Sequence, residues 1–263
     1  MIRIADAVSV TDNVVARAVD SRDTIMIRSI IQEQIAAGCD YLDLHAGWDG
    51  KAVSHMVDDL VWLVYQALEA GNVGLCLDNP NPEVIAQVAP HVAGKRKLLI
   101  NSSTAGRKHL GEMLDLALEH DAGLIVLASD DSHFSLDPQT RLAVCRKIYL
   151  RAMDAKLPPE RLFLDAIAMP LVSYPESGQV MFEVLRAIKD KFPHTKACLG
   201  LSNLSFGRRH RRAIHRACAA LAVWYGVDAM IMDCRDKELA RIIEAATLVA
   251  GLANPDDEGT PAA

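Results

Sequence analysis

Short apolar runs alternate with longer segments of helical periodicity along the whole chain. Eight of these runs have the length and the continuous apolar character of strands buried in a parallel sheet. Several of these runs are rich in Leu, which does not specifically favour strands. Their assignment as strands therefore depends on the flanking helical segments as much as on strand propensity. The expected strands are Ile2–Val8, Tyr41–Leu44, Val73–Leu77, Lys97–Ile100, Gly123–Leu127, Leu162–Leu164, Lys196–Leu199 and Val227–Met232.

Between these runs, apolar residues recur at intervals of three and four, as on one face of an α-helix. Gly38, Gly71 and Gly226 stand just before strands and mark helix ends, and Pro138 and Pro175 suit first-turn positions. The expected helices include Thr24–Ala37, Ser54–Ala70, Lys108–His120, Pro138–Ala155, Pro175–Lys191, Arg211–Tyr225 and Lys237–Ala250.

The repeated strand–helix unit predicts an α/β fold of the (β/α)8 TIM barrel type. We expect residues 1–253 to form one barrel domain and residues 254–263 to form a flexible tail. A doubly wound open sheet is the main rival. It is disfavoured because no Gly-X-Gly-X-X-Gly run follows the first predicted strand.

Composition narrows the class of protein. The N-terminal segment Met1–Asp6 lacks the regions of a signal peptide, and no apolar run reaches the ~20 residues of a membrane span, so we expect a cytoplasmic protein without membrane contact. The net charge of -6 argues against general nucleic-acid binding. The six cysteines form no Cys-X-X-Cys pair, and Asp130, Asp131 and His133 lack a recognisable ligand spacing, so we expect no metal site.

Polar residues follow four of the predicted strands at the point where each strand ends. They are Asp78, Asn101, Asp165 and the run Gly200–Asn203. The carboxyl ends of barrel strands converge on the face where such barrels carry out their chemistry. Two carboxylates and two carboxamides on that face are suited to hydrogen-bonding a flat, nitrogen-rich ligand.

Structural roles compete with this interpretation. Asp78 could cap the helix that follows it, although Asn79 or Asn81 can take that role. The Ser-Ser-Thr run after Asn101 likewise offers caps. For Asp165, a buried structural acid paired with an arginine is as reasonable as a site residue.

Other positions are more ambiguous. Asp43 points either into the barrel or toward a helix, and His45 is either a site residue or a buried core histidine. Asn203 lies on a loop whose composition is typical of mobile loops, where an amide can reach a reacting atom. Phe206 lies beside a planar ligand or closes that loop. The run Arg208–Arg212 either meets an anionic tail or cofactor rim or is a solvated helix start.

These motifs resemble those of the methyltetrahydrofolate:corrinoid-protein methyltransferases, a family of pterin-binding barrels. The resemblance runs from the first strand to about Ala250, and Gly-Leu-Ser-Asn-Leu-Ser is its most specific motif. Dihydropteroate synthases and the folate module of methionine synthase look like more distant relatives. The shared segments are Leu42–Leu44, Leu75–Asp78, Ile100–Thr104, Leu164–Asp165 and Gly200–Ser205.

The resemblance implies methyl transfer between N5 of tetrahydrofolate and the cobalt of a corrinoid, in either direction. Tetrahydrofolate or 5-methyltetrahydrofolate would be the substrate, and a partner protein docked over the barrel mouth would bring the corrinoid. Family members look like homodimers. The residues implied to bind the pterin are Asp43, Asp78, Asn101, Asp165, Gly200, Ser202 and Asn203.

Asn203 and Asp165 are the implied catalytic residues, with Asn203 near the nitrogen that carries the methyl group. Arg211, Phe206 and His45 are candidates for contact with the corrinoid or with an anionic tail.

The chain departs from the family pattern at the first strand. Many members have Glu-Arg-Ile-Asn where this chain has Asp6-Ala7-Val8-Ser9, and His45 stands where asparagine is frequent. A barrel methyltransferase with another methyl donor or acceptor, and a pterin enzyme like dihydropteroate synthase, therefore stay open as alternatives. A barrel that binds a pterin or an anion without turning it over is the third.

Overall fold

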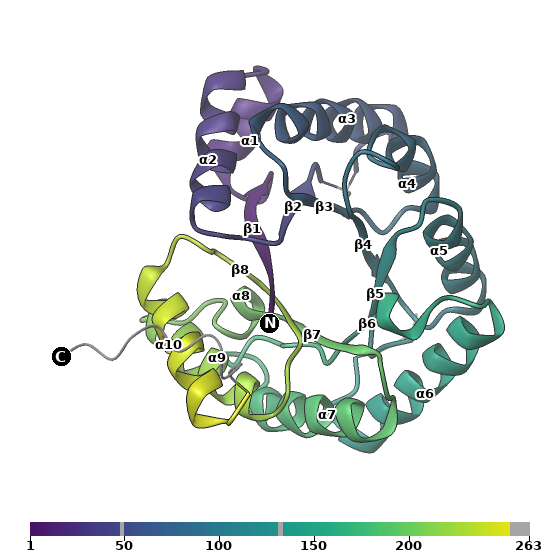
Figure 1. The fold of residues 1–263 in the computed structure, drawn as a ribbon, viewed down its shortest axis with the longest axis vertical. Coiled ribbons are helices and arrows are strands. Elements are labelled where there is room, and N and C mark those ends of the chain that lie inside the picture. The colour runs from purple at the N-terminus through teal and green to yellow at the C-terminus, as the bar shows by residue number, and fades with distance from the viewer. Residues whose placement is uncertain (48–49, 131–133, 253–263) are drawn as a thin grey trace.

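The computed structural model describes residues 1–47, 50–130 and 134–252. Eight parallel strands form a closed barrel in which each strand pairs with the next and β8 pairs with β1, inside a ring of helices (Figure 1). The predicted (β/α)8 TIM barrel is confirmed. The strands are β1 Ile2–Ser9, β2 Tyr41–His45, β3 Gly74–Asp78, β4 Leu98–Ser103, β5 Gly123–Leu127, β6 Leu162–Asp165, β7 Lys196–Gly200 and β8 Ala229–Met232.

Most helices lie where the sequence predicts them. They are α1 Asn13–Asp20, α2 Thr24–Ala36, α3 Val53–Ala70, α4 Pro82–Val88, α5 Arg107–Glu119, α6 Pro138–Asp154, α7 Ser177–Lys191, α8 Leu201–Leu204, α9 Arg211–Trp224 and α10 Lys237–Val249, with 3-10 turns at Ala89–His91 and Pro159–Arg161.

Some details of the prediction are wrong. Helix α1 was not expected, and α8 occupies the segment that was expected to be a loop. Pro138 does occupy the first turn of α6, but α7 begins at Ser177, so Pro175 precedes that helix. The expected tail at residues 254–263 lies outside the described residues.

The barrel interior is a compact apolar layer. It is formed by Ile4, Cys76, Leu99, Ile125, Phe163, Cys198 and Ala229, with Ile2, Tyr41 and Ile231 packed against them. A larger apolar cluster fills the space between the strands and the helices. Burial on both faces explains why the strands read as continuous apolar runs in the sequence.

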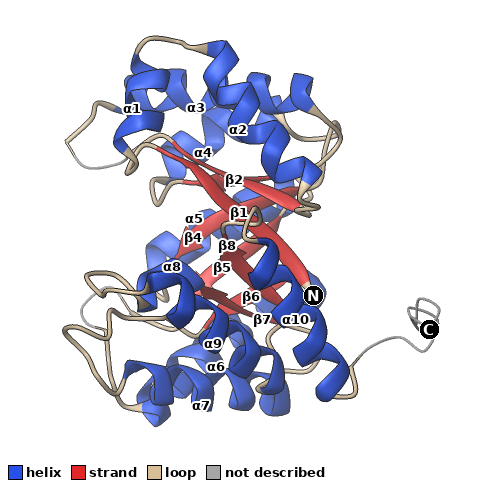
Figure 2. Ribbon diagram, turned by 90° about the vertical axis from the view of Figure 1, so that its left-hand side faces the viewer, coloured by secondary structure: helices blue, strands red, loops and turns tan. Residues whose placement is uncertain are grey.

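The strand alternation determines what lies above that interior layer. Side chains two residues apart on a strand point to the same face, so the next inward position on each strand faces the barrel mouth. Two positions after Ile4, Tyr41, Cys76, Leu99 and Phe163 come Asp6, Asp43, Asp78, Asn101 and Asp165. We call these five residues the polar layer. The strands that carry them begin on the side of the N-terminus and run toward the side where α8 lies (Figure 2).

Candidate functional site

Asp43, Asp78 and Asn101 lie together near the carboxyl ends of the neighbouring strands β2, β3 and β4. Asp43 is 6% exposed and Asn101 9% exposed. Asn101 Nδ2 donates to Asp43 Oδ1 at 3.3 Å, so Asp43 points into the barrel and the question left open by the sequence is answered. Burial, together with the nearby Asp78 carboxylate, raises the pKa of Asp43 well above its usual value. Burial also raises the pKa of Asp78, although the adjacent His45 opposes the rise.

Two buried carboxylates this close do not both ionise readily. Asp43 is the more buried of the two and its pKa is raised further, whereas Asp78 lies 3.9 Å from His45 Nδ1, which opposes the rise of its pKa. The layer therefore offers two acids of different proton affinity and one amide. These groups together can donate and accept hydrogen bonds along the edge of a planar ligand.

Asp78 is not used as a helix cap. Asn81 is the N-cap of α4 and accepts from the backbone amide of Glu83 at 2.9 Å. Buried Asn79 accepts from the amide of Asn81 at 2.9 Å, so the two asparagines build the turn. The capping expected after Asn101 is wrong, because Gly106 precedes α5 without a side-chain cap.

Asp165 is buried at the end of β6. Its Oδ1 accepts from the backbone amide of Ile167 at 2.7 Å, and burial raises its pKa to about 6. The fully buried Arg141 lies nearby but donates to the carbonyls of Ala166 and Ile167, at 2.6 and 2.8 Å. Arg141 forms no ion pair with Asp165 in the described part of the chain, so the carboxylate keeps capacity to accept from a ligand.

His45 is buried at the end of β2, next to the polar layer. Its Nδ1 lies 3.2 Å from Ser9 Oγ, and its Nε2 has no hydrogen-bond partner among the described residues. An unpaired buried ring nitrogen is costly in a core position. His45 is therefore better placed as a site residue than as a satisfied core histidine.

Helix α8 brings Asn203 to the barrel mouth. Asn203 is exposed, and its side chain makes no hydrogen bond with any residue that the structure describes. A Cβ atom on Gly200 would lie 3.1 Å from Asn203 Nδ2, so glycine at the start of this helical turn leaves the amide its space.

The turn that carries Asn203 is held from both sides. Ser202 Oγ donates to Asp6 Oδ2 at 2.7 Å, which links α8 to β1. Arg211 donates to Ser205 Oγ at 3.0 Å and to the carbonyl of Ser202 at 3.2 Å, and His215 Nε2 lies 2.6 Å from the same Ser205 hydroxyl. Arg211 thus stabilises the α8 turn directly.

Asp6, Arg141 and His215 were not singled out as site residues from the sequence. Asp6 carries the plainest sequence signal, since it follows the inward Ile4 by two positions in a predicted strand. Burial raises the pKa of Asp6, and the neighbouring Asp233 carboxylate adds to this rise.

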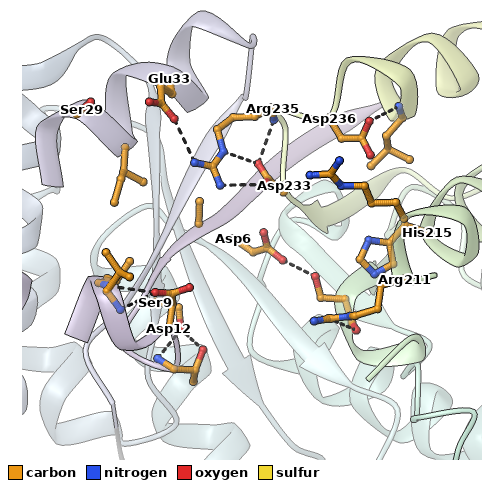
Figure 3. Close-up of a pocket in the computed structure, with 18 of the residues that line it drawn as sticks. Asp6, Ser9, Asp12, Ser29, Glu33, Arg211, His215, Asp233, Arg235 and Asp236 are labelled. Carbon is orange, nitrogen blue, oxygen red and sulfur yellow. Dashed lines mark hydrogen bonds and ion pairs between the residues drawn. The ribbon is translucent and has the colours of Figure 1, made fainter. Parts of the chain in front are cut away.

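A wide groove opens beside the polar layer, between β1, α1 and α2 on one side and α9, β8 and α10 on the other. Its volume is about 1420 Å³, and Asp6, Ser9 and Ser202 lie at its inner end. Figure 3 shows Arg211 and His215 on one wall and Arg235 held by Asp233 and Glu33 across from Ser9 and Asp12.

Phe206 and the Asp130–His133 segment are the other candidates that the sequence raised. Phe206 is 65% exposed just after α8, so it does not close the segment from inside. Asp131 and His133 lie outside the described residues. Within the described ranges no group of His, Cys, Asp and Glu has the arrangement of a metal site, and none of their helices is long and apolar enough to cross a membrane.

A closed parallel barrel with buried acids and amides at the carboxyl ends of its strands defines an α/β-barrel enzyme. Comparison with protein families is specific: the model described as pterin binding enzyme matches residues 6–233. The chain belongs to this family, and the resemblance recognised in its motifs is confirmed.

Individual relatives agree. The chain is 25% identical over 253 residues, 95% of its own length and 92% of the relative's, to a methylcorrinoid:tetrahydrofolate methyltransferase from Eubacterium limosum. Among solved structures it is similar to a dihydropteroate synthase from Xanthomonas albilineans in complex with 7,8-dihydropteroate (TM-score 0.70, 18% identity, 97% of this chain, 95% of that one). It is also similar to DHPS from Yersinia pestis (TM-score 0.69, 16% identity, 95% and 94%). At these identities the structural matches establish the fold alone.

Proposed function

We propose that this protein is a methyltransferase that moves a methyl group between N5 of tetrahydrofolate and the cobalt of a corrinoid carried by a partner protein. The observation that carries the proposal is the polar layer of acids and an amide, in which no arginine or lysine neutralises the acids among the described residues, together with the unpartnered amide of Asn203 on α8. The relative named for methylcorrinoid and tetrahydrofolate supports the choice of reaction.

In this assignment Asp78, Asn101 and Asp165 bind the pyrimidine edge of the pterin. That edge presents several N–H groups beside ring acceptors, and ionised carboxylates accept such N–H groups with short, charge-assisted hydrogen bonds. The pKa of Asp165, about 6, leaves it ionised near neutral pH. Asp43, held neutral by burial, orients Asn101 through their shared hydrogen bond.

Asn203 acts at the reacting nitrogen. A tertiary amine leaves poorly unless positive charge develops on N5, and a neutral amide dipole placed there stabilises that charge without competing for the proton. Gly200 and Ser202 form the same wall, and the Ser202–Asp6 bond holds the turn in place. The corrinoid would supply the cobalt that gives or takes the methyl group. We also propose that the partner docks over the mouth and that the chain forms a homodimer.

Methylcobalamin and tetrahydrofolate test this proposal directly, with free methylcobalamin in place of the partner. We expect wild type to form 5-methyltetrahydrofolate. Asn203→Ala should bind tetrahydrofolate within several-fold of wild type but lose about 10²–10³-fold in rate. Asp165→Ala should instead lose binding. The control is Gln139→Ala, which removes an exposed amide from α6.

The outcomes separate the alternatives. Methylcobalamin consumption that never depends on tetrahydrofolate would favour another methyl acceptor. Binding without transfer to or from any corrinoid would favour a pterin-binding protein that is not a methyltransferase. Formation of 7,8-dihydropteroate from 4-aminobenzoic acid and a 6-hydroxymethyl-dihydropterin diphosphate, with release of diphosphate, would favour the synthase chemistry. Equal tetrahydrofolate affinity of wild type and Asp165→Ala would remove the pterin assignment itself.

A further inference from the structure

The proposed pterin-binding residues of the polar layer and the groove lie on opposite arcs of the barrel mouth, and Asp6 belongs to both the layer and the groove. The proposed pterin-binding residues Asp78, Asn101 and Asp165 stand on β3, β4 and β6, whereas the groove begins at β1, α8 and β8. A flat ligand held by its pyrimidine edge on the first arc must direct its opposite end to the second. In a folate, that end carries N5 and, on the neighbouring carbon, the p-aminobenzoyl-glutamate tail.

We propose that the groove binds the tail of the folate substrate and favours forms with several γ-linked glutamates; the inference rests on the proposed function. The groove's volume of about 1420 Å³ exceeds the roughly 300–1,000 Å³ of an ordinary small-molecule site. The groove therefore has room for more than one glutamate beyond the benzoyl group.

One wall of the groove is apolar and exposed. Val14 of α1 is 41% exposed, and Ile25 and Met26 at the start of α2 are 85% and 39% exposed. Ile30, one helical turn beyond Met26, continues the same surface. Apolar side chains gathered at the edge of a groove indicate a ligand surface, and a benzoyl ring leaving the pterin meets this wall first.

The acidic residues of the groove are already partnered within the protein. Asp12, Asp23 and Asp236 accept from backbone amides at the starts of α1, α2 and α10. Asp233 and Glu33 bind Arg235, and Glu238 binds Arg241. Arginines therefore offset part of the charge of Asp233, Glu33, Asp236 and Glu238, whereas Asp12 and Asp23 are held only by helix amides, so an anion would bind away from them.

The cations opposite them are free to bind an anion. Arg212 and Lys237 are exposed and form no ion pair or hydrogen bond with the described residues. Arg211 bonds only to a hydroxyl and a carbonyl. These three positive charges, spread from the start of α9 to the start of α10, match carboxylates that recur along an oligoglutamate.

Calorimetric titration with three ligands tests the inference: 6-methyltetrahydropterin, which lacks a tail, tetrahydrofolate, and tetrahydrofolate with three glutamates. Wild type should bind them in that order of rising affinity, at least tenfold from first to last, and added salt should narrow the difference. The double variant Arg212→Ala/Lys237→Ala should lose about tenfold for the triglutamate and keep its affinity for the tailless pterin. Arg212→Lys/Lys237→Arg should retain the wild-type preference.

Lys147→Ala, which removes an exposed lysine from α6, is the matched control and should change no affinity. The inference fails if wild type binds all three ligands equally. It also fails if the double variant binds the triglutamate like wild type or weakens the tailless pterin by the same factor. In those cases the proposed function survives, since the pterin still binds. Absence of binding by all three ligands would overturn both.

Discussion

The two arcs of the barrel mouth treat charge in opposite ways. On the arc of β2, β3, β4 and β6, burial raises the pKa of Asp43, Asp78 and Asp165. On the groove side, burial also acts on Asp233, but hydrogen bonds from Arg235 and Gln34 outweigh it and bring the Asp233 pKa below its usual value. Asp236 behaves like Asp233, because Arg216 and the α10 amides outweigh its partial burial.

This difference in pKa separates the acids that stabilise the fold from those that we propose bind a ligand. A carboxylate with a lowered pKa already has its partners and stabilises the structure as an anion. A buried carboxylate with a raised pKa has too few partners to offset its burial, and such groups are candidates for binding a ligand. Asp165, with a pKa of about 6 and one backbone donor, belongs to the second class.

The largest expected effect is on ligand affinity at Asp165. Asp165→Asn keeps the shape and the hydrogen bond from Ile167 but loses the charge and presents an amide donor to ligand donors, so tetrahydrofolate affinity should fall about 10²-fold at pH 7.5. Below pH about 6 the wild-type affinity should fall by about tenfold per pH unit as Asp165 takes up its proton. The variant should not follow this dependence.

Titrations between pH 8 and pH 5 measure both features. Asp154→Asn, an exposed carboxylate at the end of α6, is the control and should leave the wild-type curve unchanged. A wild-type affinity that stays constant through pH 6 would mean that Asp165 does not bind the ligand as an anion.

The next effect is on stability, and its sign should differ between the arcs. Because the folded-state pKa of Asp165 is raised, the folded state binds more protons than the unfolded state between pH about 4 and 6, and stability falls as the pH rises through that window. Asp165→Asn removes this cost and should raise the free energy of unfolding by about 1–3 kcal/mol at pH 7.5. Asp236→Ala should lower it by about 1–2 kcal/mol, since it removes a cap and the Arg216 partner.

Urea unfolding of both variants at pH 7.5 checks the two signs. If both Asp165→Asn and Asp236→Ala lose stability, the acids on both arcs stabilise the fold, and the proposed difference between the arcs is wrong.

Much of this arrangement could be predicted from the chain. The apolar strand runs are continuous because both faces are buried, and their polar ends at Asp78, Asn101 and Asp165 lie where the alternation places inward side chains. The prediction worked where each strand is regular up to its polar residue. The alternative caps Asn79 and Asn81 were also visible locally.

The missing parts depend on contacts distant in sequence. Asp6 lies within the register shift between Ala5 and Val8, so the regular alternation of β1 is interrupted at this residue. Its partner Ser202 is 196 positions away, and no local pattern reports that bond. Asn203 was expected on a long loop after the seventh strand, whereas the structure has the single helical turn α8, which Arg211 and Asp6 hold through the serines. Tertiary contacts stabilise such a turn more than helix propensity does.

The smallest expected effect is at Asp6, which stands where the two arcs meet. Asp6 has a raised pKa, like the pterin-side acids, because burial and the nearby Asp233 disfavour its anion, yet it also has a partner in Ser202. Asp6→Asn can still accept from Ser202 and carries no charge, so it should gain about 1 kcal/mol or less at pH 8. The gain should vanish as the pH falls and the wild-type acid becomes neutral, since a raised folded-state pKa costs stability only above the unfolded value.

Glu33→Gln provides the contrast: it removes an exposed partner of Arg235, and its small effect should be a loss of stability at pH 8. If the gain in stability of Asp6→Asn persists unchanged at low pH, the charge of Asp6 is not its cause. Asp6 would then resemble the structural acids of the groove rather than the other acids of the polar layer.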